Sequence, residues 1–129
     1  MTDDAWLMRI KYGIWNRWRA EHPDAAVKLD GVKLDGMVLT GLNFSGASFR
    51  GASLHATNLM NADLRGVDFT GANLTEADLI GANLEGAILR GAVLHEADLL
   101  GASLANAQYA PEDLAGALHV PTAGAPPSS

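Results

Sequence analysis

A large apolar residue occurs at every fifth position over most of this chain. The stretch GANLTEADLIGANLEGAILRGAVLHEADLLGASL, residues 71–104, has a leucine at each of these positions. Five residues of α-helix advance by about 500°, so these leucines would not form one stripe along a helix. In a β-strand, an odd step would place alternate leucines on opposite faces. The spacing therefore favours a solenoid, in which the chain turns a corner every five residues and points each leucine at a common axis.

The central apolar position of the repeat forms the predicted core. Alanine lies two residues earlier in most repeats, where a corner leaves little volume inside. Asn, Asp or Ser often lies between the two, and these side chains bond to nearby backbone in turns. Sixteen residues hold the central position: Leu29, Leu34, Leu39, Phe44, Phe49, Leu54, Leu59, Leu64, Phe69, Leu74, Leu79, Leu84, Leu89, Leu94, Leu99 and Leu104.

The repeated pattern A(N/D)LxG resembles the pentapeptide-repeat family, over residues 27 to about 116. The resemblance implies an all-β solenoid: a right-handed, quadrilateral parallel β-helix with four pentapeptides in each coil. Residues 25–118 would form about four to four and a half such coils. A shift of twenty matches residues 71–84 to residues 91–104 at ten of fourteen positions, but a shift of ten matches nine. The square cross-section is therefore implied mainly by the family.

Residues 1–24 are predicted to form a capping α-helix at the N-terminal end of the solenoid. An open solenoid end exposes unpaired backbone groups and needs a cover. The stretch WNRWRAEHPD resembles an element that precedes the repeats in many bacterial pentapeptide-repeat proteins. An alternative is a helix on a membrane surface, which four acidic residues in the segment disfavour. One side of the helical wheel carries the predicted cap residues Trp6, Ile10, Ile14 and Trp18.

The rest of the chain is consistent with one domain that lacks disulfides. It has 129 residues, no cysteine and a net charge of -6. PEDL at 111–114 is predicted to form a short helical turn, and residues 119–129 a disordered tail. The N-terminus lacks a secretory apolar segment, and no apolar run has the ~18 residues of a membrane span, so we expect a cytoplasmic protein.

An apolar stripe is predicted on the outside of the solenoid. If each coil has twenty residues, the residues that follow the central positions align in columns between coils. One column contains Met60, Ile80 and Leu100, and exposed apolar patches mark contact sites. The stripe would contact a protein partner or a second copy of the chain. Alternatively, the tail or the N-terminal helix of the same chain covers it.

An acidic patch is also predicted, because residues 67–129 carry one basic and eight acidic residues. Glu76 would stack on Glu96, and Asp78 on Asp98, between neighbouring coils, where like charges are destabilising. The patch is a candidate site for a basic partner or a cation. In the alternative interpretation, the aspartates stabilise corners and the glutamates project into solvent.

We expect no catalytic site, no metal site and no cofactor. His55 and His95 would be two coils, roughly 10 Å, apart, which is too far to share a metal ion. No phosphate loop, CxxC pair or HExxH motif occurs. The sequence therefore predicts a noncatalytic, rigid module for protein–protein interaction or structure, with a protein partner or a weak homodimer and no direct binding of nucleic acid.

Resemblance to the family also implies an alternative function, a DNA mimic that binds DNA gyrase or topoisomerase. Four and a half coils at ~4.8 Å would form a rod of roughly 22 Å. This is the length of only about six or seven base pairs. The length argues against the alternative.

Overall fold

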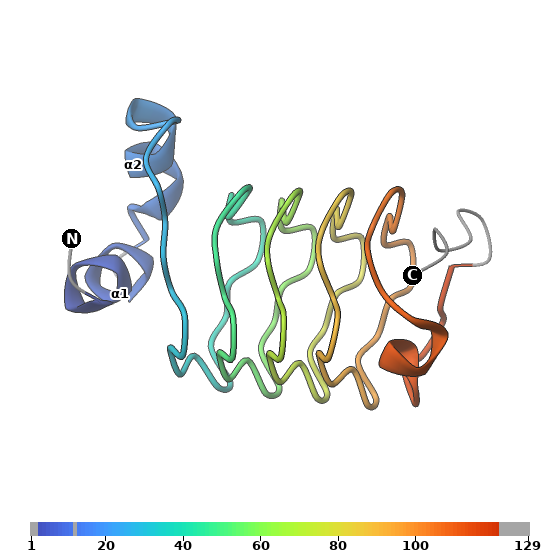
Figure 1. Ribbon diagram of the computed structural model, residues 1–129. Helices are drawn as coiled ribbons and strands as arrows, with labels where there is room; N and C mark the ends of the chain where they lie inside the picture. Colours follow the sequence, from blue (N-terminus) through green and yellow to red (C-terminus); the bar gives the residue numbers. More distant parts are fainter. Residues whose placement is uncertain (1–2, 12, 122–129) are drawn as a thin grey trace.

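The computed structural model describes residues 3–11 and 13–121. Two helices, α1 (Asp3–Lys11) and α2 (Trp15–Glu21), lie at one end of a coiled chain (Figure 1). A short 3-10 helix, η1 (Pro111–Leu114), lies near the other end. The coils stack side by side between these ends, so the chain forms an elongated solenoid.

Parallel β-bridges join residues twenty positions apart, from Lys28 with Ser48 to Asp98 with Leu118. Four bridging residues occur in each twenty-residue turn, one on each side of the coil. We number the sides by their first bridging residues: Lys28 for face 1, Lys33 for face 2, Val38 for face 3 and Asn43 for face 4. The bridges are isolated, and no longer strand occurs among the described residues. Corners every five residues leave only the middle of each side free to pair, so the predicted β-helix consists of bridges and turns.

The sixteen central side chains fill the inside of the coils, and each is at most 2% exposed. The alanines two positions earlier, from Ala47 to Ala107, are buried beside them. Aromatic rings extend through part of the core, because Phe49 lies 5.2 Å from Phe44 and 5.6 Å from Phe69 between ring centroids. Burial of so much apolar surface between neighbouring coils is the main stabilising contribution expected for a repeat fold.

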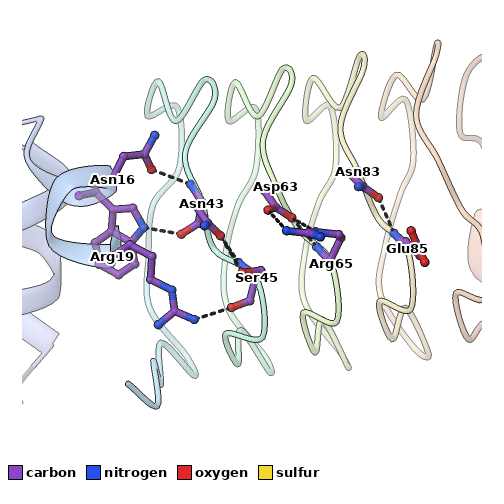
Figure 2. A network of polar contacts seen from close by, with 9 residues as sticks. Asn16, Arg19, Asn43, Ser45, Asp63, Arg65, Asn83 and Glu85 are labelled. Carbon is purple, nitrogen blue, oxygen red and sulfur yellow. Dashed lines mark hydrogen bonds and ion pairs between the residues drawn. The ribbon is translucent and has the colours of Figure 1, made fainter. Parts of the chain in front are cut away.

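Polar side chains form hydrogen bonds with the backbone at the corners of the coils. On face 4, the Asn83 side-chain oxygen accepts a hydrogen bond from the Glu85 N–H at 3.0 Å. The same bond joins Asp63 to the Arg65 N–H, one coil earlier, in the column shown in Figure 2. The short Asn and Asp side chains of the repeat therefore satisfy backbone donors at the turns, as their position in the sequence predicts.

The N-terminal segment contains two helices, so the prediction of one continuous helix is wrong. Gly13, with a φ of 71°, lies between α1 and α2. Its N–H donates to the Ile10 carbonyl, and the Ile14 N–H donates to the Arg9 carbonyl at 3.1 Å. This pair of bonds is a Schellman motif, which ends a helix with a left-handed glycine. The chain then changes direction, and α2 lies against the coils.

Three tryptophans pack together where the helices meet the first coil. Trp15 is fully buried, and its ring lies 5.8 Å from Trp6 and 5.1 Å from Phe44. Trp6, Ile10 and Trp18 are buried as predicted for a cap, but Ile14 is 49% exposed, because the chain turns at Gly13. These buried side chains face the coils, which contradicts the alternative of a helix whose apolar side lies on a membrane. Within the described residues, no helix is long and apolar enough to cross a membrane.

Candidate interaction surfaces

Side chains of α2 take the place of a preceding coil on face 4. The Trp15 Nε1–H donates to the Asn43 carbonyl at 2.7 Å, and the Asn16 side-chain oxygen accepts from the Asn43 N–H at 2.8 Å. The Arg19 guanidinium, which is buried, donates to the Ser45 carbonyl at 2.8 Å (Figure 2). In an inner coil these backbone groups would bond to the neighbouring coil. The helix therefore satisfies this edge of the first coil as well as covering the core.

Face 3 carries the predicted apolar stripe. Met60 and Ile80 are half-buried and Leu100 is 52% exposed, so no described residue covers the outer part of the stripe. Residues 122–129, most of the predicted tail, lie outside the described residues. Val120 follows Leu100 by twenty positions and is 37% exposed, but the described bonds that continue the coil register end at Leu118 and His119 has a φ of 53°, so the stripe is not extended to Val120.

The bridging column of face 3 adds two more exposed apolar side chains. Val38 is 73% exposed at the N-terminal end, and Leu118 is 45% exposed at the other end. Neither residue belongs to the predicted stripe. The bridging residues between them are polar, so apolar side chains concentrate toward the C-terminal end of this face. The apolar surface there combines Leu100 with Leu118, which bridges to Asp98 in the preceding coil.

The predicted acidic patch consists of carboxylates in two different environments. Asp78 and Asp98 form a parallel bridge on face 3, and each accepts a backbone N–H at 3.0 Å, from Ile80 and Leu100 respectively. Asp98 also pairs with the His119 ring at 2.9 Å, and this hydrogen bond holds the pKa of Asp98 below its usual value. The two aspartates therefore stabilise corners, as in the alternative interpretation.

Glu76 and Glu96 occupy corners where most repeats have glycine, each with a φ of 59°. Both side chains are exposed, and they approach different histidines: Glu76 lies 3.5 Å from His55, and Glu96 lies 3.8 Å from His95. Each of the two histidines thus lies near a different glutamate. Within the described part of the chain, no group of three or more His, Cys, Asp or Glu side chains could hold a metal ion.

Comparisons with known proteins agree with the repeat pattern. The family model for pentapeptide repeats matches residues 28–66, 53–91 and 77–108, with eight copies. The crystal structure of alr5209, a pentapeptide repeat protein from Nostoc PCC 7120, is 32% identical with a TM-score of 0.64. The match covers 77% of this chain and 89% of that one.

A second solved structure is AT2G44920, a pentapeptide repeat protein from the thylakoid lumen of Arabidopsis thaliana. It is 28% identical with a TM-score of 0.64, and the match covers 75% of this chain. The chain spans 64% of that protein's length. No curated protein matches. The match of the family model to more than half of the residues shows that the chain belongs to the pentapeptide-repeat family.

Proposed function

We propose that this protein is a noncatalytic docking module that binds another protein through the apolar stripe of face 3. In this proposal about four and a half coils form a rigid rod, and α1 and α2 are its N-terminal cap. The observation that carries the proposal is the exposure of Leu100 and Leu118, which lie in neighbouring coils at the C-terminal end of face 3. An apolar column of this kind on a largely polar surface is a feature of protein contact sites.

The charges around the stripe indicate the chemistry of the partner. Asp78 and Asp98 lie on the same face, and Glu76 and Glu96 lie at the corner beside it. A partner surface with apolar side chains surrounded by lysine or arginine would complement this pattern. A second copy of the chain would bring like charges together if the two faces overlapped fully. A different protein with a basic surface therefore fits the stripe better than a homodimer does.

Affinity capture with matched variants tests this proposal. The bait would be the full chain, presented to proteins from cells of its own organism, with Leu100→Glu as the stripe variant. Ala105→Glu is the control, because Ala105 is exposed in the same coil, follows the central Leu104 on face 4 and gives the same change in charge. We expect a protein that the unchanged chain and Ala105→Glu both retain and Leu100→Glu loses. Equal capture by all three baits would contradict the proposal.

The alternative of a DNA mimic that binds gyrase remains a separate hypothesis. Eight of the fifteen acidic residues lie in residues 67–129 together with a single basic residue, so the net negative charge is concentrated in only part of the rod. Purified DNA gyrase in a supercoiling assay distinguishes the two functions. Inhibition of supercoiling that Leu100→Glu leaves unchanged would favour the DNA mimic over docking through the stripe.

A further inference from the structure

The first coil has backbone groups that no other described residue satisfies. In an inner coil, a bridging residue uses both of its backbone groups toward the preceding coil: the Ser53 N–H donates to Val32, and its carbonyl accepts from Leu34, both at 2.8 Å. On face 4 of the first coil, α2 replaces that missing coil at Asn43. The corresponding N–H and carbonyl groups of Lys28, Lys33 and Val38 have no hydrogen-bond partner among residues 3–11 and 13–121.

These three open edges differ in how they are protected. Lys28 and Lys33 carry exposed cationic side chains on faces 1 and 2, and edge lysines oppose pairing with another strand. Val38, on face 3, is 73% exposed and has no charge. A β-branched apolar residue on an unpaired edge favours pairing with a further extended segment. The edge at Val38 is therefore the most receptive of the three.

An apolar groove lies beside this edge. Its volume is about 520 Å³, and it is lined by Leu7, Met8 and Lys11 of α1 and by Lys33 and Met37 of the first coil. Met37 is only half-buried, although the same inward position is buried in the following coils. No preceding coil packs on Met37, and side chains of α1 line the same groove. The groove therefore has apolar walls and two lysines at its border.

We propose that the Val38 edge and this groove bind an extended peptide segment of another protein. The segment would add one strand to face 3, as in other cases of β-augmentation, with its main chain bonded to the free groups of Val38. One apolar side chain would pack between Met8 and Met37, since methionines adapt to varied shapes. An Asp or Glu of the peptide, close to this apolar side chain, would form an ion pair with Lys11 or Lys33. This proposal concerns the N-terminal end of face 3 and does not depend on the stripe.

Selection of short random peptides displayed on phage, with the full chain as target, provides the probe. We expect the selected peptides to combine apolar and acidic residues. For one such peptide, synthesised with a fluorescent label, Met8→Glu and Lys11→Glu should each weaken the Kd by about tenfold or more, because central contacts dominate such interfaces. Lys28→Glu is the matched control and should leave the Kd unchanged, since Lys28 lies on face 1.

Amide hydrogen exchange of the same complex provides a readout at the edge itself. The Val38 N–H should exchange rapidly in the free chain and become protected when the peptide binds, whereas the Lys28 N–H should stay unprotected. Failure to select any peptide, or a Kd that neither Met8→Glu nor Lys11→Glu changes, would overturn the proposal. Protection of Val38 in the free chain would also overturn it, because a second copy or the chain itself would then occupy the edge.

Discussion

Replacing Trp15 by alanine tests whether α2 closes the end of the solenoid. Trp15 is fully buried, packs against Phe44 and donates a 2.7 Å hydrogen bond to the Asn43 carbonyl. Truncation of a buried Trp to Ala costs about 3–5 kcal/mol of unfolding free energy. For a domain of this size, a loss of about 4 kcal/mol lowers the Tm by about 15 °C. The Asn43 carbonyl would also lose its hydrogen-bond donor. We therefore expect the loss of unfolding free energy to lie toward the upper end of this range.

Thermal unfolding followed by circular dichroism measures this effect, and Ile14→Ala is the matched control. Ile14 immediately precedes Trp15 but is 49% exposed, so we expect its variant to change stability by less than about 0.5 kcal/mol. Trp15→Phe should lie between the two, because it keeps an aromatic ring but loses the Nε1–H donor and part of the buried ring volume. If Trp15→Ala and Ile14→Ala had the same Tm, α2 would not contribute to the stability of the coils.

Three further predictions concern the core, the C-terminal end and the two terminal segments. Leu79→Asp should unfold the protein or cause aggregation, because a carboxylate in the core has no partner and its desolvation costs several kcal/mol; Thr75→Asp, on the outside, should melt nearly like the unchanged chain. The hydrogen bond with His119 lowers the pKa of Asp98 from the usual 3.8. The Asp98 carboxylate therefore stabilises the native state above pH 3.8, and this contribution is lost as the pH falls through the lower pKa of the native state. Melts at decreasing pH should therefore show a smaller loss of stability for Asp98→Asn than for the unchanged chain. Removal of α1 and α2 should lower the Tm far more than removal of residues 119–129, because only the first truncation exposes the core; equal melting temperatures would contradict the cap.

The inward register of the repeats can be predicted from the sequence, because the five-residue period couples each position directly to the inside or outside of a coil. The sixteen central residues are all buried, and Asp78 and Asp98 lie side by side in neighbouring coils. The twenty-residue turn was less evident, since a shift of ten residues gives nearly the same number of matches. The number of residues in a coil is set by which repeats contact each other in space. The sequence alone does not show these contacts.

The N-terminal segment was predicted less accurately. The helical wheel is consistent with one helix through Trp18, but Gly13 ends α1 and separates Trp15 from the predicted apolar side. A glycine inside a helical pattern was the available signal for this break. The function of Trp15 and Asn16 in bonding to Asn43 depends on where the first coil lies, and sequence spacing alone does not specify that position.

The apolar surface of face 3 was predicted only in part, because the repeat pattern fades after Leu114. At residues 117–120 the leucine occurs one position early, at Leu118, and His119 occupies the place where a central leucine would be expected. The structure keeps the twenty-residue register through the bridge of Leu118 with Asp98. Counting twenty positions from Asp98 identifies Leu118, whose exposed side chain lies in the bridging column of face 3.

Site-specific photo-cross-linking in living cells tests the central claim, that face 3 is the docking surface, most directly. A photoreactive amino acid would replace Leu100 in one variant and Ala105, in the same coil on face 4, in another. Docking through face 3 predicts a discrete cross-linked protein from position 100 and little or none from position 105. Cross-linking of the same protein at equal yield from both positions, or only from position 105, would contradict it.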